Sequence, residues 1–154
     1  MVRFIFVLAL VLLLVTPSLG QQSLLGTYKL VSLAPEIDGK PFQAMGKAPH
    51  GYMVLTPTRF IYFVTAEDRK FGTSVDDKAA LFDSMVGYAG TYRIEGDKFI
   101  LINEVSWVES GIGKPYEETF QLSGNLLTTT LGPMPWARDP SKKFVRREVW
   151  EKIE

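Results

Sequence analysis

Few residues in this chain have the chemistry of an acid, a base or a metal ligand. The sequence has one histidine, His50, and no cysteine. Histidine has the side chain whose ordinary pKa lies nearest to neutrality, so His50 is a candidate for catalytic proton transfer. The alternative is a surface residue in the loop between Pro49 and Gly51. No serine, lysine or carboxylate stands at a spacing that would complete a nucleophilic triad with it.

Glu104 is the second candidate for acid or base chemistry, because it lies in the middle of a largely apolar segment, Phe99–Trp107. Both faces of a strand over this segment are apolar. The sequence therefore leaves open which face lines an interior, and a β-bulge would exchange the two faces. A buried Glu104 would need a partner such as Arg93 or Arg146, whereas a Glu104 on the outer wall would not.

The remaining acidic pairs favour structural roles. Glu117 and Glu118 are adjacent, so on a strand they point to opposite faces and cannot both enter an interior. Asp76 and Asp77 follow Ser74 at the spacing of a helix capping box. With one histidine and no cysteine, a transition-metal site would need mostly carboxylate ligands at unmarked spacing. We therefore predict no metal site and no cofactor.

Aromatic residues recur on most of the expected strands. They suit either an ordinary hydrophobic core or the wall of a cavity that holds a small molecule. Loops around Phe42, Met45 and Trp136 suit an apolar cover over one end, with a small core under a loop as the alternative. The residues that we expect to contact a ligand are Tyr52, Tyr62, Phe63, Tyr92, Glu104, Trp107, Phe120 and Trp136.

Short strands are the elements that must position these residues. Segments rich in β-branched and aromatic residues, separated by turn-forming residues, predict strands over 26–33, 51–56, 59–65, 91–94, 99–107, 117–122, 126–131 and 144–153. Apolar residues three and four apart between Val75 and Val86 predict one short amphipathic helix, and residues 34–49 are expected to form a long loop. Strands and helices do not alternate, which favours an antiparallel sheet closed as a barrel or folded as a sandwich.

The start of the chain has the pattern of a signal peptide. A positively charged start precedes the apolar run Phe4–Val15, and the small residues Ser18 and Gly20 follow it. This run is shorter than the roughly 18 to 20 residues that span a bilayer. We therefore predict that residues 1–20 are a signal peptide, and that residues 21–154 are one exported domain without a permanent membrane anchor. Whether export ends in the periplasm or outside the cell is left open.

Composition excludes several function classes. Lys and Arg together number 17, as do Asp and Glu, so the chain lacks the electrostatic footprint of a nucleic-acid-binding protein. Without cysteine it has no disulfide, no thiolate chemistry and no cysteine-based metal site. The domain must therefore be held together by packing, and burial of each large apolar side chain contributes about 1.5–3 kcal/mol.

Several ordered motifs resemble landmarks of the bacterial and fungal lipocalin-like domain family. They are Leu24–Ser32 (LLGTYKLVS), Pro49–Met53, Tyr88–Tyr92 followed by Gly96-Asp97, Gly124–Leu126 and Val149–Lys152. The resemblance spans nearly all of residues 21–154. It implies an all-β fold, an antiparallel lipocalin-like barrel of about eight strands with one short helix, and a cavity for a small molecule.

The resemblance also implies details at single positions. In related barrels a basic residue of the last strand packs over the first-strand aromatic ring, a role that Arg146 or Arg147 would take over Tyr28 here. Relatives often carry histidine in the strand after the Gly-Asp turn, whereas this sequence has Leu101, Ile102 and Asn103 there. A histidine-based reaction therefore does not carry over.

The sequence thus supports two main functions. The first is an exported protein that binds or carries a small, largely apolar ligand in its barrel. The second is a cofactor-independent isomerase, cyclase or hydratase that acts on a small hydrophobic substrate in the same cavity, with His50, Glu104 or a tyrosine as acid or base. A purely structural or interaction role remains if the barrel is solidly packed. The sequence does not indicate an oligomeric state.

Overall fold

The structure is a computed structural model that describes residues 23–43, 45–109, 111–136 and 138–154. The predicted signal peptide, residues 1–20, lies outside the described residues. Within the described ranges, no helix is both long enough and apolar enough to cross a membrane.

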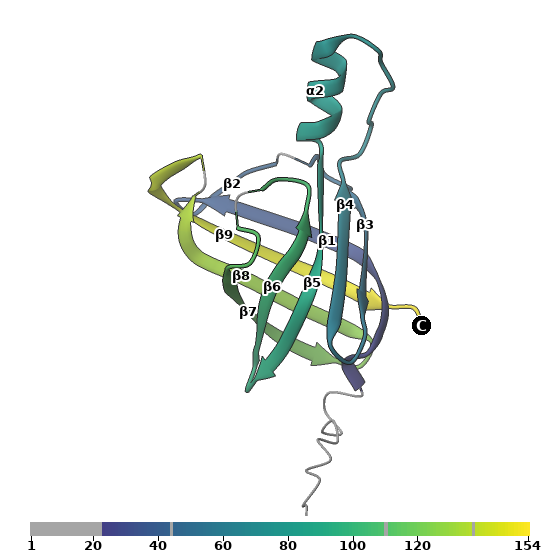
Figure 1. Cartoon of the computed structure of the whole chain (residues 1–154), viewed down its shortest axis with the longest axis vertical. Coiled ribbons are helices and arrows are strands. Elements are labelled where there is room, and N and C mark those ends of the chain that lie inside the picture. The colour runs from purple at the N-terminus through teal and green to yellow at the C-terminus, as the bar shows by residue number, and fades with distance from the viewer. Residues whose placement is uncertain (1–22, 44, 110, 137) are drawn as a thin grey trace, which may run out of the picture.

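Strands dominate the described part of the chain (Figure 1). In chain order, the elements are β1 (Gly26–Ile37), β2 (Lys40–Pro41), β3 (His50–Leu55), β4 (Arg59–Thr65), α2 (Val75–Asp83), β5 (Met85–Glu95), β6 (Lys98–Ser106), β7 (Pro115–Ser123), β8 (Leu126–Trp136) and β9 (Asp139–Lys152).

The sheet closes on itself, because β1 pairs with both β3 and β9. All pairings are antiparallel, and the strand order is β1-β3-β4-β5-β6-β7-β8-β9 before the sheet returns to β1. The two-residue β2 pairs with the end of β1. Tight turns join several of the strands, and Gly96 and Gly124 adopt φ values of 63° and 61° in two of them, as two-residue hairpin turns require. The predicted eight-stranded antiparallel barrel with one short helix is confirmed.

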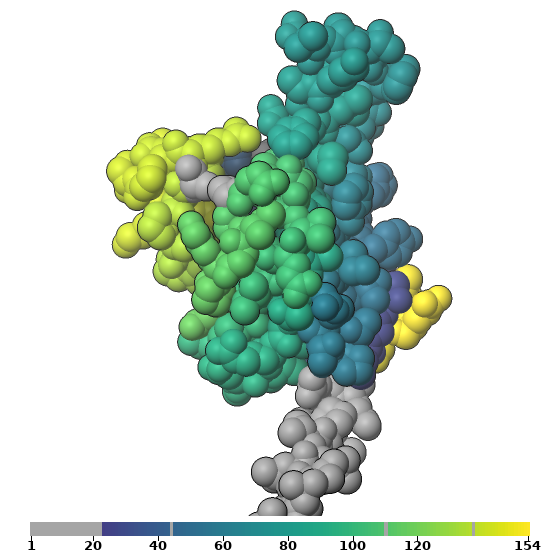
Figure 2. Space-filling view, in the orientation of Figure 1, coloured from purple at the N-terminus to yellow at the C-terminus, as the bar shows by residue number. Residues whose placement is uncertain are grey.

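The helix differs from its predicted bounds at one end. Ser74 caps α2 and forms the expected capping box with Asp77. However, α2 ends at Asp83, and β5 already begins at Met85. Met85–Gly90 pairs with residues 60–65 of β4, so strand pairing prevails over the helical spacing of the apolar residues. None of the residues of α2 is buried, and the helix stands out beyond the barrel (Figures 1 and 2).

Two segments that were predicted to be loops extend the strands instead. β1 continues through residues 34–37, and β8 continues through residues 132–136. Both extensions pair with β9. Phe144 of β9 lies opposite Ile37 of β1 on one side and opposite Met134 of β8 on the other. The barrel wall is therefore taller near α2 than the sequence predicts.

Side chains of alternate residues fill the barrel interior. The tightest packing lies at the end away from α2, where Tyr28, Phe60, Leu127 and Trp150 are almost completely inaccessible to solvent. We call this region the packed end. Aromatic pairs contribute to it, including the Tyr92–Phe99 edge contact with ring centres 5.6 Å apart.

Candidate functional site

Charged side chains occupy the middle of the barrel interior. On β9, alternation turns Phe144, Arg146, Glu148 and Trp150 to the same face. The side chains of Arg146 and Glu148 are only 13% and 1% exposed. Glu118 enters the interior from β7 and is 9% exposed. Charged groups so deeply buried need partners.

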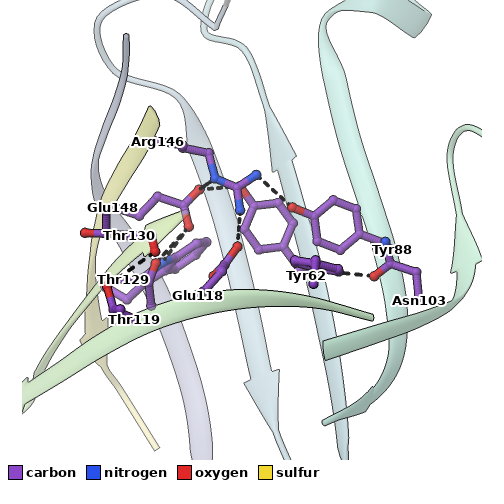
Figure 3. Close-up of polar contacts among 11 residues, drawn as sticks. Tyr62, Tyr88, Asn103, Glu118, Thr119, Thr129, Thr130, Arg146 and Glu148 are labelled. Carbon is purple, nitrogen blue, oxygen red and sulfur yellow. Dashed lines mark hydrogen bonds and ion pairs between the residues drawn. The ribbon is translucent and has the colours of Figure 1, made fainter. Parts of the chain in front are cut away.

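Arg146 is at the centre of these contacts (Figure 3). Its Nη2 donates to Oε1 of Glu118 over 2.6 Å, and its Nη1 donates to the hydroxyl of Tyr88 over 2.9 Å. Its Nε lies 3.1 Å from Oε1 of Glu148, but no hydrogen bond of good geometry joins these atoms. We therefore regard the Nε contact as an ion pair.

Glu148 is surrounded by hydrogen-bond donors in addition to Arg146. The Tyr62 hydroxyl donates to Oε1 over 2.6 Å. The Thr129 hydroxyl and Trp150 Nε1 each donate to Oε2 over 3.2 Å. Three such donors beside a guanidinium suit an ionised carboxylate, which only accepts hydrogen bonds.

Aromatic rings pack against these polar groups. The rings of Tyr62 and Tyr88 stack in parallel with centres 4.6 Å apart. The Arg146 guanidinium carbon lies 5.3 Å from the centre of the Tyr62 ring, within the range of a cation–π contact. Tyr62, Tyr88, Glu118, Arg146 and Glu148 together form what we call the Arg146 cluster.

Burial shifts the pKa values in the Arg146 cluster. It raises the pKa of Glu118 to about 7, although Arg146 opposes the shift. It also raises the pKa values of the Tyr62 and Tyr88 hydroxyls above their usual range. Burial alone would lower the pKa of Arg146, but Glu148 and the two tyrosines raise it well above the ordinary value. Arg146 therefore stays positively charged, and Glu118 is the group in the cluster that titrates near neutrality.

A cavity of about 220 Å³ lies above the Arg146 cluster, at the end of the barrel that carries α2. We call it the open-end cavity. Most of its wall is aliphatic or aromatic, and Tyr62 and Arg146 belong both to this wall and to the cluster. The lining residues are Leu33, Pro35, Phe42, Met45, Tyr62, Val64, Asp83, Val86, Trp107, Trp136, Arg138, Phe144 and Arg146.

The structure brings three of the predicted ligand contacts together. Tyr62, Trp107 and Trp136 line the open-end cavity, as do Phe42 and Met45 from the predicted cover. Phe42 contacts Trp136 edge-on with ring centres 5.8 Å apart. A role in ligand binding stays a prediction for these residues, but their position fits it.

Two other predicted contacts lie inside the barrel but away from the cavity. The Tyr92 hydroxyl donates to the carbonyl of Thr56 over 2.7 Å. Phe120 stacks on Phe99 with ring centres 4.2 Å apart. Both rings therefore belong to the hydrophobic packing of the interior.

Tyr52, Phe63, Glu104 and His50 lie on the outside of the barrel. Tyr52 and Phe63 are opposite each other on the outer faces of β3 and β4. His50, at the start of β3, is exposed. None of the four lines the open-end cavity, so the structure does not support a catalytic His50 or Glu104 within it.

Glu104 lies at a β-bulge, but strand alternation already places it on the outer face, because Phe99 and Leu101 of β6 enter the core. The register between β5 and β6 shifts between Ala89 and Gly90, and their partners are Val105 and Asn103. Glu104 is the extra residue, and it points outward to an ion pair with Arg59 over 2.6 Å. The outer-wall alternative for Glu104 is therefore the one that the structure supports.

The predicted site residues do not include Tyr88, Glu118, Arg146 or Glu148. One sequence pattern indicates the position of Arg146 and Glu148. They alternate with Phe144 and Trp150, so that two apolar residues flank two charged ones on one face.

The adjacent pair Glu117 and Glu118 follows the prediction that its two side chains face opposite ways. Glu118 enters the interior, while Glu117 pairs with Lys98 outside over 2.7 Å.

The implied contact of a basic residue with Tyr28 is wrong. Arg146 lies over Tyr62, and Arg147 faces outward, where it pairs with Glu36 over 2.6 Å. The Tyr28 hydroxyl donates to the Leu24 carbonyl over 2.8 Å.

The described residues contain no group of three or more His, Cys, Asp or Glu side chains that could hold a metal ion. Glu118 and Glu148, the two buried carboxylates, both contact Arg146. The arrangement places two polar side chains, Tyr62 and Arg146, at one wall of a largely apolar cavity.

Comparison with protein families gives a match that covers the barrel. Residues 25–153 match the lipocalin-like domain, which covers the whole barrel from the start of β1 to the end of β9. No curated protein matches the chain.

Proposed function

From the premise that this chain belongs to the lipocalin-like domain family, whose barrel is a ligand-binding fold, we propose that it binds and carries one small, largely apolar molecule in the open-end cavity. The observation that carries this proposal is the contrast inside one barrel. The packed end is filled by side chains, whereas about 220 Å³ is open beneath α2.

The wall of the cavity supports an apolar ligand. Small-molecule sites are mostly apolar pockets with a few placed polar groups, and here those groups are Tyr62 and Arg146 at the inner wall and Asp83 and Arg138 among the lining residues. The volume lies below the roughly 300–1,000 Å³ of pockets for drug-sized molecules. A ligand of one or two fused rings, or a short chain, therefore fits the proposal best.

Export is part of the proposal. It rests on the apolar run Phe4–Val15 and the small residues that follow it. If residues 1–20 are a signal peptide, the protein isolated from its own organism begins at Gln21. Intact-mass measurement tests this expectation, and a mass that includes residues 1–20 would contradict it.

Binding is tested with N-phenylnaphthylamine, a neutral dye that fluoresces in apolar surroundings. Val86 lines the cavity, so Val86→Trp should fill it and weaken dye binding at least tenfold. The control is Val105→Trp, because Val105 lies on the outer face of β6 and is 65% exposed. Equal loss of binding in both variants, or no binding to the wild-type protein, would contradict the proposal.

A cofactor-independent enzyme is the second candidate, and one observation favours it. Arg146 joins the cavity wall to Glu118, whose pKa of about 7 suits proton transfer near neutrality. Mass spectrometry of a bound ligand before and after incubation tests this candidate. A rearranged or hydrated product that Glu118→Gln fails to form would support an enzyme, whereas an unchanged ligand would support a carrier.

A further inference from the structure

Aromatic rings surround the open-end cavity on several sides. Trp136 comes from the end of β8, Trp107 follows β6, Phe144 begins the inward row of β9, and Phe42 lies in the segment after β2. The Tyr62 ring forms part of the inner wall. Rings prefer to contact other rings in stacked or edge-on arrangements. A wall of this composition favours a flat aromatic or conjugated ligand over a saturated chain.

The inner wall holds hydrogen-bond donors that the protein does not use. A guanidinium has five N–H groups. Within the described residues, Arg146 makes contacts through one N–H on Nη1, one on Nη2 and the one on Nε. One N–H on each terminal nitrogen therefore has no partner among the described residues. The Tyr62 hydroxyl is not available in the same way, because it donates to Glu148.

The charges around these donors disfavour an anion. Arg146 contacts two carboxylates, Glu118 and Glu148. The combined charge of Arg146, Glu118 and Glu148 is zero when Glu118 is protonated and negative when Glu118 is ionised. A buried anionic ligand would therefore lack a compensating charge. Elsewhere the lining holds one acidic residue, Asp83, and one basic residue, Arg138, so it adds no net charge. A neutral oxygen acceptor, such as a carbonyl, faces no such penalty.

We propose that the ligand of the open-end cavity is a neutral, flat aromatic or conjugated molecule whose carbonyl oxygen accepts a hydrogen bond from the terminal nitrogens of Arg146. This inference rests on the proposed binding function and specifies its ligand class. Arg146 is the residue that determines specificity, while the rings of Trp107, Trp136 and Phe42 contact the flat part of the ligand.

Displacement of N-phenylnaphthylamine at about pH 8 tests the ligand class with four probes of similar size. Acetylnaphthalene is flat, neutral and carries a carbonyl; naphthoate replaces the ketone by a carboxylate; ethylnaphthalene lacks oxygen; and decalyl methyl ketone is saturated. We expect acetylnaphthalene to bind at least tenfold more tightly than naphthoate and several-fold more tightly than the other two.

Substitution of Arg146 by lysine tests the hydrogen bond. A lysine has three N–H donors instead of five, which its contacts to Glu118, Glu148 and Tyr88 would use. Arg146→Lys should therefore keep the buried charge but bind acetylnaphthalene and ethylnaphthalene equally. The control is Arg147→Lys on the outer face, next to Glu36, which should keep the wild-type preference.

The outcomes separate this inference from the proposed function. If the dye does not bind the wild-type protein at all, the proposed function fails. If the dye binds but naphthoate or the saturated ketone competes as well as acetylnaphthalene, the ligand class is wrong and the binding function stands. Should Arg146→Lys fail to fold, the ranking of the four probes on the wild-type protein still decides the ligand class.

Discussion

The two ends of the barrel interior are built from the same alternating strands, yet one is filled and the other is open. At the packed end, two-residue turns such as Gly96-Asp97 and Gly124-Asn125 close the wall tightly. At the α2 end the connections are longer, including residues 42–49 and 66–74. The cavity lies at this end, and Phe42 and Met45 of the first connection form part of its wall.

The Arg146 cluster is the boundary between these two ends. Glu148 accepts a hydrogen bond from Trp150 of the packed end, and Arg146 lines the open-end cavity. The barrel thus separates the packed end, whose residues hold the fold without lining the cavity, from the open end, and Arg146 belongs to both because it pairs with two buried carboxylates and lines the cavity. The following variants test that separation, in order of decreasing expected effect.

Trp150→Ala should have the largest effect on stability. Trp150 is fully buried and donates to Glu148, so we expect the free energy of unfolding to fall by about 5 kcal/mol, at the upper end of the range for such substitutions. The matched variant is Trp136→Ala at the open-end cavity, which should lose about 1 kcal/mol or less. Urea unfolding measures both, and similar losses would contradict the distinction between the two ends.

Arg146→Met should be the next most disruptive change. It leaves Glu118 and Glu148 buried without their cation, which typically costs about 3–5 kcal/mol. We expect about 3 kcal/mol, because Glu118 can take up a proton and remove part of the repulsion. Arg147→Met is the control: its exposed ion pair with Glu36 should contribute no more than about 1 kcal/mol. If both variants unfold at the same urea concentration, the cluster is not an isolated buried ion network.

Glu118 should make stability depend on pH. Burial raises its folded pKa from the ordinary 4.5 to about 7. The folded state therefore binds the proton more tightly than the unfolded state. This contribution is complete below about pH 4.5 and is lost as the pH rises through about 7.

The slope of this loss is at most about 1.4 kcal/mol per pH unit for one proton. Glu118→Gln should remove it, whereas Glu117→Gln on the outer face should not, because Glu117 lies in an exposed pair with Lys98. Unfolding curves measured across this pH window test the expectation, and an unchanged slope in Glu118→Gln would assign the titration to another group.

Ser74→Ala should have the smallest effect on the whole protein. The Ser74 cap stabilises its helix by about 1 kcal/mol, but α2 buries none of its own side chains. We therefore expect faster amide exchange in residues 75–83 with little change in global unfolding. Hydrogen exchange measured by mass spectrometry separates these effects, and a large loss of global stability would show that α2 supports the barrel.

Much of the fold follows from local patterns. Alternating apolar residues, turn glycines and the absence of strand–helix alternation predict an antiparallel barrel, and the Ser74–Asp77 spacing predicts the start of α2. The end of α2 does not follow from them. The apolar spacing continues to Val86, but the pairing of residues 85–90 with β4 determines where the strand begins.

The candidate site was predictable only in part. Trp107, Trp136 and Tyr62 are aromatic residues on or near strands, which is enough to nominate them. The same criterion also nominates Tyr52 and Phe63, which lie outside. Glu104 shows the limit most clearly, because both faces of β6 are apolar in sequence and only the packing of Phe99 and Leu101 into the core shows that Glu104 faces outward.

The sequence by itself determined the strand-rich architecture, the family and the opposite facing of Glu117 and Glu118, because these depend on residue type and on period-two alternation. Only the tertiary structure decided which face is interior, where the barrel stays open and that Arg146 contacts two carboxylates. Those features depend on register and barrel closure, which bring β4, β5, β7 and β9 together from distant parts of the chain. A cavity is the space that such closure leaves unfilled, and no single segment encodes it.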